Sequence, residues 1–349
     1  MQNTQDAKDI SSNRVGLIGI TMGCPVGIGP EIILRFMEMQ EGFGQFTPIV
    51  IGDIALLRRC AKELQVPIEI VQWQPGDPVS DQKLHVVEPE AGEGYSLHAE
   101  SLHWGEPDKE TGHAAAAYIT KAVQLIRQGV LDAMVTCPIA KYAMQLAGYN
   151  FPGHTEMLAS LCNSNNFGMM MAGKRLKVSL VTIHTPLAKV PEQLSQDEIM
   201  RIINLTGETL VRDLGIASPR IAVAGLNPHS GEVGLFGEEE NRMIEPAISA
   251  AVSGKWKVFG PLPPDTVFKK AMDNEFDAVV AMYHDQGLIP FKLVHFEDGV
   301  NLTMGLPIIR TSVDHGTAYD IAGQGIASAS SLEASFALAG QIIYNRKNY

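Results

Sequence analysis

Cysteine is scarce in this sequence. The 349 residues include Cys24, Cys60, Cys137 and Cys162, and no two of them are spaced as a C-x-x-C pair. This spacing excludes a disulfide framework and a short-spaced cysteine zinc site. We therefore expect four reduced thiols in a cytoplasmic protein.

Long apolar runs are also lacking. No stretch of about 18 apolar residues occurs, so the sequence predicts no membrane-spanning helix. The opening residues MQNTQDAKDISSNR are polar and lack the apolar segment of a secretory signal. We expect no signal peptide, and a disordered tail over residues 1–13.

Positive charge is in deficit, with 27 Lys and Arg against 39 Asp and Glu and a formal net charge of −12. An acidic chain repels phosphate backbones and anionic lipid head groups, so nucleic acid and membrane surfaces are not expected partners. A small anionic substrate is compatible with this charge, because a local basic pocket can form within an acidic surface.

Apolar, β-branched segments alternate with helical patterns along the chain. Their near-continuous hydrophobicity is typical of strands covered on both faces, as in parallel sheets. Alternating strands and helices predict an α/β fold with a mainly parallel sheet, and the length suits more than one domain. The predicted strands are VGLIGI (15–20), PIVIG (48–52), LDAMVT (131–136), VSLVTI (178–183), RIAVAG (220–225) and DAVVAM (277–282).

The clearest predicted helix begins at Ser195 and ends at Gly215. Ser195 and Glu198 form an S-x-x-E capping box at its start. Its buried face is predicted to carry Ile199, Ile203, Leu210 and Leu214. Further helices are expected from about residue 112 to Gly129, after residues 238–241 with a kink or break at Pro246, and over about 331–343.

Three predicted strands are followed by a histidine: His184, His229 and His284. Ligands bind outside the carboxyl ends of the strands in open parallel sheets, and three neutral imidazoles are a common set for a divalent metal. The alternative is that each is a structural histidine, because a single histidine at a strand end more often has that role.

Several residues near these strands are candidates for binding an anion. His154 and Thr155 stand before a helical pattern, where backbone N–H groups attract anions; an ordinary N-cap by Thr155 is the alternative. Lys292 and Asn301 are further candidates. Arg310 follows the apolar run 306–309, so it requires an anionic partner, either a ligand or a structural carboxylate.

Two glycine-containing loops stand out. GITMGCPVGIGPEI (19–32) follows the first strand but is neither a dinucleotide fingerprint nor a P-loop. SVDHGTAYDIAGQGIA (312–327) is rich in small residues, so its backbone could approach a planar ring or a ribose. Asp320 in this loop could accept hydrogen bonds from ribose hydroxyls or cap a helix.

Taken together and in this order, a set of longer motifs resembles the 4-hydroxythreonine-4-phosphate dehydrogenase family of vitamin B6 biosynthesis. The resemblance extends from about Gly16 to near residue 340. Part of it, HGTAYDIAG, is also similar to the adenine-binding loop of isocitrate and isopropylmalate dehydrogenases. The motifs are PGHTE, TIHTPL, GLNPHSGEVGLFGEEE, GPLPPDTVF, YHDQGLIPFK and NLTMGLPIIRTSVDHGTAYDIAG.

The resemblance implies two α/β/α domains of the isocitrate/isopropylmalate dehydrogenase type, with the active site in a cleft between them. We expect residues 14–146 plus 318–349 in the first domain and 147–317 in the second. The resemblance also implies a homodimer whose active sites are shared between subunits.

The resemblance assigns roles to individual residues. The metal ligands would be His184, His229 and His284, contributed across two subunits. The substrate contacts would be His154, Thr155, Lys292, Asn301 and Arg310. By analogy with the larger superfamily, the NAD or NADP site would be His315, Gly316, Thr317, Ala318 and Asp320.

The reaction that the resemblance implies is oxidation of 4-phosphooxy-L-threonine at C3 by NAD(P)⁺, followed by decarboxylation to 3-amino-2-oxopropyl phosphate. The proton acceptor would be neutral Lys292 or Asp265, although Asp265 could instead cap a helix. Asp285 would orient the metal ligands or lie near the metal. Three imidazoles suit zinc, and cobalt, manganese or magnesium could also serve.

Other functions remain open from these motifs. Within the same superfamily they are dehydrogenases of 4-phospho-D-threonate, of 4-phospho-D-erythronate and of aromatic cis-dihydrodiol carboxylates. A non-redox metal-dependent lyase or phosphatase would use the same histidines without the 312–327 loop. A binding protein without catalytic activity is a third class.

One position departs from the family pattern. The family usually has an acidic residue in the first glycine loop, in a pattern like M-G-D-P-A-G-I-G-P-E, where this chain has Cys24. The substitution removes a hydrogen-bond acceptor, so it bears on the role of this loop more than on the reaction.

Overall fold

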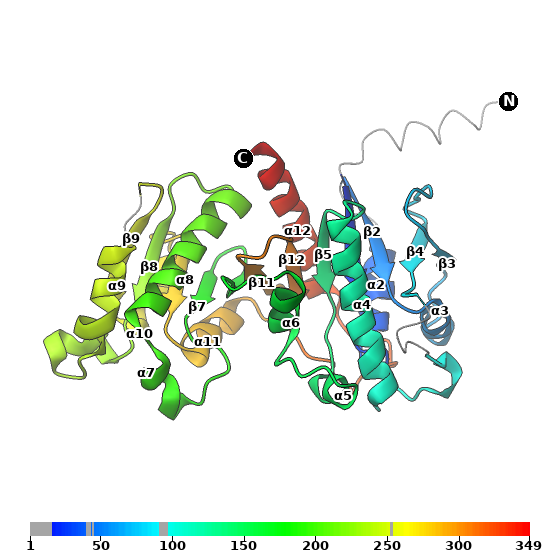
Figure 1. The fold of residues 1–349 in the computed structure, drawn as a ribbon, viewed down its shortest axis with the longest axis horizontal. Coiled ribbons are helices and arrows are strands. Elements are labelled where there is room, and N and C mark those ends of the chain that lie inside the picture. The colour runs from blue at the N-terminus through cyan, green and yellow to red at the C-terminus, as the bar shows by residue number, and fades with distance from the viewer. Residues whose placement is uncertain (1–15, 40–42, 44, 91–96, 252–253) are drawn as a thin grey trace. The chain divides into compact units, whose positions relative to one another are not determined.

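The computed structural model describes residues 16–39, 43, 45–90, 97–251 and 254–349 (Figure 1). The tail predicted over residues 1–13 lies outside the described residues. The described chain divides into two compact units. The first unit runs to Asn163 and resumes over Pro307–Gly340; the second comprises Ser164–Leu306 and Gln341–Tyr349.

This division differs from the expected domains at three segments. Residues 147–163 and 307–317 belong to the first unit, where β12 (Arg310–Val313) pairs in parallel with β5 (Ala133–Thr136). Residues 341–349 belong to the second unit, where Arg346 donates to both carboxylate oxygens of buried Asp213 at 2.7 and 2.9 Å. Long-range pairing of this kind has no local sequence signal.

The first unit contains a fully parallel set of strands in the order β3-β4-β2-β1-β5-β12. The strands not yet given are β1 (Gly16–Thr21), β2 (Phe46–Ile51), β3 (Glu69–Gln72) and β4 (Lys83–Val87). The helices are α2 (Gly29–Glu38), α3 (Ile54–Glu63), α4 (Lys109–Arg127), α5 (Lys141–Leu146), α6 (His154–Leu161) and the start of α12 (Ser330–Asn348).

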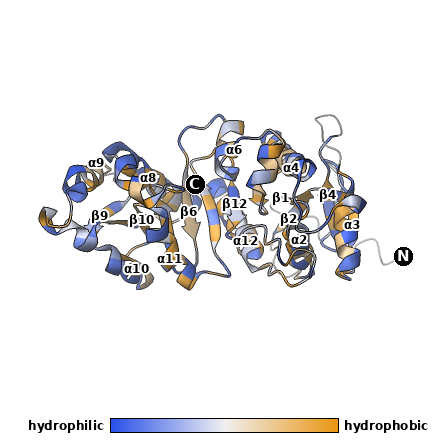
Figure 2. Ribbon diagram, turned by 90° about the horizontal axis from the view of Figure 1, so that it is seen from below, coloured by the Kyte–Doolittle hydropathy of each residue, from blue (hydrophilic) through white to orange (hydrophobic). Residues whose placement is uncertain are grey.

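These helices lie on both faces of the first unit's strands. Figure 2 shows α4 and α6 on one face and α2 and α3 on the other. On the α2 face the rings of Phe36 and Phe336 lie 5.2 Å apart, which joins α2 to α12 in an aromatic cluster with Phe43. The unit is therefore a three-layer α/β/α structure.

The second unit has its strands in the order β11-β6-β7-β10-β8-β9. β6 is antiparallel to both of its neighbours, whereas β7, β10, β8 and β9 are parallel. The strands are β6 (Gly168–Ala172), β7 (Lys177–Leu180), β8 (Arg220–Ala224), β9 (Lys257–Leu262), β10 (Ala278–Ala281) and β11 (Val300–Met304). The helices are α7 (Val190–Gln193), α8 (Gln196–Glu208), α9 (Glu245–Ala250), α10 (Pro264–Met272) and α11 (His284–Val294).

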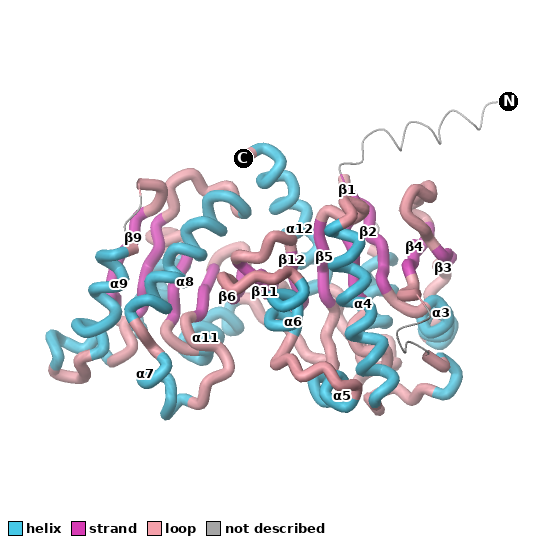
Figure 3. The backbone as a smooth tube through the Cα atoms, viewed as in Figure 1, coloured by secondary structure: helices cyan, strands magenta, loops and turns pink. Residues whose placement is uncertain are grey.

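The second unit is also a three-layer structure. Helices α8 and α9 cover one face of its strands, and α10 and α11 cover the other (Figures 2 and 3). Apolar colour in Figure 2 is concentrated toward the strands, and polar colour lies on outward helix surfaces. The mainly parallel α/β fold predicted from the alternating pattern is confirmed, with three layers in each unit.

Each predicted strand is present with its ends shifted by a few residues, as β1, β2, β5, β7, β8 and β10. The pattern did not predict β3, β4, β6, β9, β11 and β12, and two of these, β3 and β9, are partly or largely exposed. β3 is four residues long and half-exposed, and β9 contains glycine and proline and is largely exposed. Such segments lack the continuous apolar run that signals a buried strand.

The predicted helices are present, with two changes of detail. Ser195 caps α8 by accepting from the N–H of Glu198 at 3.2 Å, but the Glu198 carboxylate pairs with Arg201, so the capping box is only half formed. The helix before Pro246 changes from a π-type turn (Glu240–Ile244) to α9, as the proline requires. In the described part of the chain, no helix has the length and apolar character to cross a membrane.

Candidate active site

The three candidate metal-binding histidines all follow neighbouring strands of the second unit. β7, β10 and β8 lie side by side and are parallel, so their carboxyl ends share one edge. Each histidine lies past its strand: His184 and His229 are in connecting segments, and His284 is the first residue of α11. All three histidines therefore follow the carboxyl ends of neighbouring strands.

His184 and His284 lie together. Their ring centroids are 6.0 Å apart, and both line a pocket of about 510 Å³ with Tyr283, Asp285 and Thr185. Nδ1 of His284 is 2.6 Å from Asp285 Oδ1, so the carboxylate holds the proton on this nitrogen and leaves Nε2 as the lone-pair donor. A carboxylate that fixes the tautomer is the usual support of a metal-binding histidine, so these residues fit a divalent ion.

His229 does not join this pair within the chain. Its ring is mostly exposed, with Nδ1 3.4 Å from Glu232 Oε1 and the ring centroid 5.9 Å from that of Phe236. Among the residues that the structure describes, no three His, Cys, Asp or Glu side chains form a group that could hold a metal. The structure therefore brings together two of the three predicted ligands.

The backbone at His229 is strained. The φ angles of His229, Ser230, Glu232 and Val233 are 54°, 56°, 45° and 58°, in the left-handed region, with Gly231 between them at 78°. Each non-glycine residue there costs about 1–2 kcal/mol, and β-branched Val233 is especially unfavourable. Other contacts must offset this cost.

A buried carboxylate supports the segment before this turn. Glu240 Oε1 accepts from the backbone N–H groups of Leu226 and Asn227, both at 2.8 Å, and Oε2 accepts from Asn227 Nδ2 at 2.9 Å. From α11, Gln286 donates to the carbonyl of Gly225 at 2.7 Å and accepts from the N–H of Met282 at 2.7 Å. The sequence analysis missed both residues, since their roles depend on segments distant in the chain.

A basic group forms in the first unit around Arg310. The guanidinium is buried and donates to the hydroxyl of Thr136 at 2.7 and 3.1 Å. Burial lowers the pKa of Arg310 to about 9, and the Glu156 carboxylate opposes this shift. A buried cation in a polar setting of hydroxyls is suited to binding a phosphate or carboxylate.

His154 belongs to the same group. Burial, together with the charges of Arg310 and Lys141, holds the pKa of His154 well below its usual range, so the imidazole is neutral at pH 7. Its Nε2 is buried and has no hydrogen-bond partner among the described residues. The N-cap of α6 is Gly153, without a side-chain cap, so the alternative that Thr155 is an ordinary N-cap is wrong. The structure therefore brings His154 close to the Arg310 guanidinium, and Thr155 follows His154 in the first turn of α6.

The remaining substrate candidates lie in the second unit. Lys292 is on α11 and half-buried, and Asn301 is on β11 with a buried Oδ1 that has no partner among the described residues. Asp265 is exposed in the first turn of α10, whose N-cap is Pro263 without a side-chain cap. The alternative that Asp265 caps this helix is therefore wrong.

The two glycine-containing loops of the first unit contact each other, which the sequence did not predict. The N–H of Ile28 donates to the carbonyl of Thr317 at 3.1 Å, and Tyr319 Oη donates to Cys24 Sγ at 3.5 Å. Ala318 has a φ of 43° and Asp320 is exposed. The thiol at position 24 thus serves as the acceptor for a tyrosine of the other loop, and burial raises its pKa.

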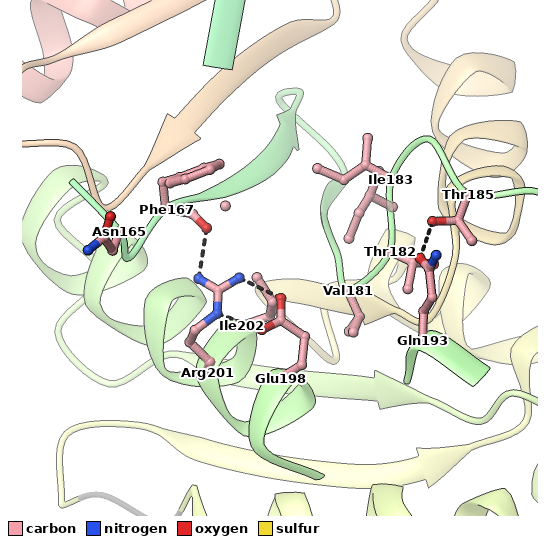
Figure 4. Close-up of a pocket in the computed structure, with 12 residues that line it drawn as sticks. Asn165, Phe167, Val181, Thr182, Ile183, Thr185, Gln193, Glu198, Arg201 and Ile202 are labelled. Atoms are coloured by element: carbon pink, nitrogen blue, oxygen red, sulfur yellow. Dashed lines mark hydrogen bonds and ion pairs between the residues drawn. The ribbon is translucent and has the colours of Figure 1, made fainter. Parts of the chain in front are cut away.

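A second pocket, of about 640 Å³, also lies in the second unit and was not predicted (Figure 4). Several of its polar side chains already have hydrogen-bond partners. Arg201 donates to Glu198 at 2.5 and 2.8 Å and to the carbonyl of Phe167 at 2.7 Å, and Thr185 donates to Gln193 at 2.6 Å (Figure 4). Because these groups already have partners, the histidine pocket is the better candidate for the chemistry.

Comparison with known proteins gives consistent matches. Residues 44–339 match the family model described as pyridoxal phosphate biosynthetic protein PdxA. The chain is 53% identical over 327 residues to the 4-hydroxythreonine-4-phosphate dehydrogenase of Desulfosudis oleivorans, covering 93% of this chain and 95% of that protein. It is 42% identical to the D-threonate 4-phosphate dehydrogenase of Salmonella typhimurium, covering 93% and 98%.

Among solved structures, the 4-hydroxythreonine-4-phosphate dehydrogenase of Klebsiella pneumoniae is similar, with a TM-score of 0.83 and 40% identity. The similarity covers 95% of this chain and 99% of that one. Residues 44–339, which match the family model, contain His184, His229 and His284 as well as His154, Thr155 and Arg310.

Proposed function

Because this chain belongs to the family of pyridoxal phosphate biosynthetic protein PdxA, we propose that it is an NAD(P)- and metal-dependent dehydrogenase of 4-phosphooxy-L-threonine. The C3 hydroxyl is oxidised to a ketone, and the carboxylate then leaves as CO₂. The product is 3-amino-2-oxopropyl phosphate, a precursor in vitamin B6 biosynthesis. The observation that carries the proposal is the pocket in which His184 and His284 lie together.

The proposed mechanism divides the work among side chains. When bound, a divalent ion supplies Lewis acidity and a nicotinamide dinucleotide supplies the hydride acceptor. His184 and His284 hold the ion, and Asp285 keeps His284 in the tautomer that can bind it. Zinc suits such imidazole ligands, and cobalt, manganese and magnesium are the alternatives.

The substrate anions are held by the first unit. Arg310 and Thr155 donate to the phosphate or carboxylate, and neutral His154 donates from the buried nitrogen that has no other described partner. Fixing these anions limits the orientations of the carbon that reacts. In the second unit, Lys292 and Asn301 contact the substrate, with Lys292 as the proposed proton acceptor and exposed Asp265 as the weaker candidate. Residues 315–318 and Asp320 are the proposed dinucleotide contacts.

The proposal includes a homodimer in which His229 serves the partner's site. Ile289 and Leu293 on α11 are 61% and 83% exposed, and Phe296, just after the helix, is 76% exposed. Leu235 and Val233, beside His229, are 72% and 97% exposed. Apolar side chains gathered in this way are typical of surfaces covered by another chain. We place the reaction in the cytoplasm, because the four cysteines are buried free thiols.

A second candidate is the oxidation of 4-phospho-D-threonate, favoured by the 42% identity to the Salmonella enzyme of that name. The erythronate analogue would use the same residues. An aromatic cis-dihydrodiol carboxylate ranks lower, since a substrate without phosphate would not need the whole basic group around Arg310. A lyase, phosphatase or binding protein would need no dinucleotide.

The test is the formation of reduced nicotinamide by full-length protein, first stripped of metal and then reloaded with zinc, cobalt, manganese or magnesium. The substrates are 4-phosphooxy-L-threonine, 4-phospho-D-threonate and 4-phospho-D-erythronate. We expect turnover to favour the L-threonine derivative and to fall more than about hundredfold with chelator, because the Lewis acid is lost.

His284→Ala should match the effect of the chelator, while Glu192→Ala, a change at an exposed carboxylate of α7, should not. Preference for 4-phospho-D-threonate or 4-phospho-D-erythronate would change the assigned substrate but leave the metal-dependent oxidation as proposed. No turnover with any of them would refute the dehydrogenase assignment.

A further inference from the structure

We propose that Glu240 is a positioning residue, whose buried carboxylate fixes the segment 225–234 in the conformation that presents His229 to a metal ion. This inference rests on the proposed function, because His229 acts as a ligand only in that reaction. It adds a role for a residue that does not touch metal, cofactor or substrate.

The carboxylate of Glu240 is the centre around which the segment folds. The side chain is 2% exposed, and its two oxygens accept from two backbone N–H groups and one side-chain amide just before His229. Glu240 opens a π-type turn whose Met243 and Ile244 are buried, so the carboxylate is held from a packed element. It can therefore impose a position on the segment.

The backbone passes close to this carboxylate at two glycines. A Cβ at Gly231 would lie 2.7 Å from Glu240 Oε2, and one at Gly225 would lie 3.1 Å from Oε1 and 2.9 Å from Ser230 Oγ. Any side chain at Gly231 would displace either the carboxylate or the turn. On the other side, Gln286 of α11 binds the carbonyl of Gly225 at 2.7 Å, so the segment is held from both sides.

The position of the His229 imidazole depends on this backbone. Its side chain is 62% exposed, and its hydrogen-bond distance to Glu232 is a long 3.4 Å. Four non-glycine residues of the turn have positive φ, a conformation that a free chain leaves readily. Without the carboxylate the turn is expected to relax and to move the imidazole.

The first test compares Glu240→Gln with Glu239→Gln in full-length, metal-free protein. The amide nitrogen introduced at position 240 would face Asn227 Nδ2, two donors against each other. The Glu239 carboxylate accepts from Asn227 Nδ2 and from the backbone of Glu238 and Glu239, so it holds no backbone of the segment 225–234. We expect amide hydrogen exchange over 226–236 to be about tenfold faster in E240Q and nearly unchanged in E239Q.

The second test is zinc affinity, measured by competition with a chromophoric chelator. We expect E240Q to weaken binding about 10- to 100-fold, as loss of a supporting group does at metal sites. In the His229→Ala background, E240Q should cause no further loss, because the two residues act through one ligand. A purely structural role would weaken binding equally in both backgrounds.

Gly231→Ala provides a second route if E240Q folds poorly. Its methyl group would press on the carboxylate from the other side at a φ of 78°, so it should reproduce the faster exchange and weaker zinc binding. Three outcomes would each overturn the proposal. They are unchanged amide hydrogen exchange in both E240Q and G231A, losses of zinc affinity that add when E240Q is combined with H229A, and wild-type protein that binds no zinc. The protein could lack dehydrogenase turnover while the effects of E240Q and H229A on zinc affinity remain coupled. That result would support the positioning role and refute only the proposed reaction.

Discussion

His154 is a neutral imidazole in a cationic setting. It stands at the start of α6, where Arg310 on β12 and Lys141 on α5 supply positive charge and Glu156 on α6 supplies negative charge. Burial and the cations both disfavour a proton on this ring. A bound phosphate would reverse the balance, because its charge offsets those of Arg310 and Lys141.

The low pKa of His154 predicts how stability depends on pH. Between the folded pKa and the ordinary value of 6.5, the unfolded chain binds a proton that the folded chain does not. Stability therefore falls as pH falls below 6.5, by up to about 1.4 kcal/mol per pH unit from this group.

His154→Gln should flatten the dependence of Tm on pH between roughly 7.5 and 5.5, the range that brackets the usual histidine pKa. His103→Gln, at an exposed histidine of the same unit, should leave it as in wild type. Equal slopes for wild type and H154Q would contradict the prediction. If the basic group around Arg310 binds anions, inorganic phosphate should also reduce the slope of Tm against pH in the wild-type protein.

Helix α4 shows how a local signal becomes a stable element. Asp108 accepts from the N–H of Thr111 at 2.8 Å, and Thr111 Oγ1 accepts from the N–H of Asp108 at 2.8 Å, which completes a capping box. The helix then packs close, because a Cβ at Gly112 would lie 2.0 Å from the carbonyl of Ala143. A defect at this cap therefore weakens the contact between α4 and α5.

Asp108→Ala should destabilise the first unit by about 1–2 kcal/mol, since the N–H of Thr111 loses its acceptor. The expected decrease in Tm is about 2–4 °C per kcal/mol for a unit of this size, measured by differential scanning calorimetry. Asp108→Asn keeps an acceptor oxygen and should restore most of the loss. An equal decrease for both variants would show that charge, not capping, decides the effect.

The apolar residues on and beyond α11 bear on the assembly of the molecule. Ile289 and Leu293 are one helical turn apart on α11, and exposed Phe296 lies two residues after the helix ends. Helix α11 begins at His284, so a partner chain bound to its apolar residues would lie along the helix that carries a proposed metal ligand. His229, left outside the pair within its own chain, would then meet a partner's site.

Leu293→Asp should convert the proposed dimer to monomer. Burying a leucine contributes roughly 1.5–3 kcal/mol, and each copy contributes one, so the dimer Kd should rise more than about hundredfold. Sedimentation velocity over a concentration series measures this change. Leu146→Asp, at a 46% exposed leucine of α5, is the matched control. A monomeric wild type, or dimers in both variants, would refute the proposed interface.

The sequence by itself determined much of this protein. Continuous apolar runs marked the central strands, the Ser195 signal marked α8, and His184 and His284 were predicted at the edge where they lie together. These features depend on residues close in the chain, where periodicity and caps act directly. The long motifs pointed to the family that residues 44–339 match.

Only the tertiary structure decided the rest. It placed residues 147–163 in the first unit, joined the Cys24 loop to Tyr319, made β6 antiparallel, and set His229 in a left-handed turn around Glu240. Each of these depends on contacts between segments distant in sequence. Such contacts form only when the fold brings their hydrogen-bond partners together, so no local pattern carries them.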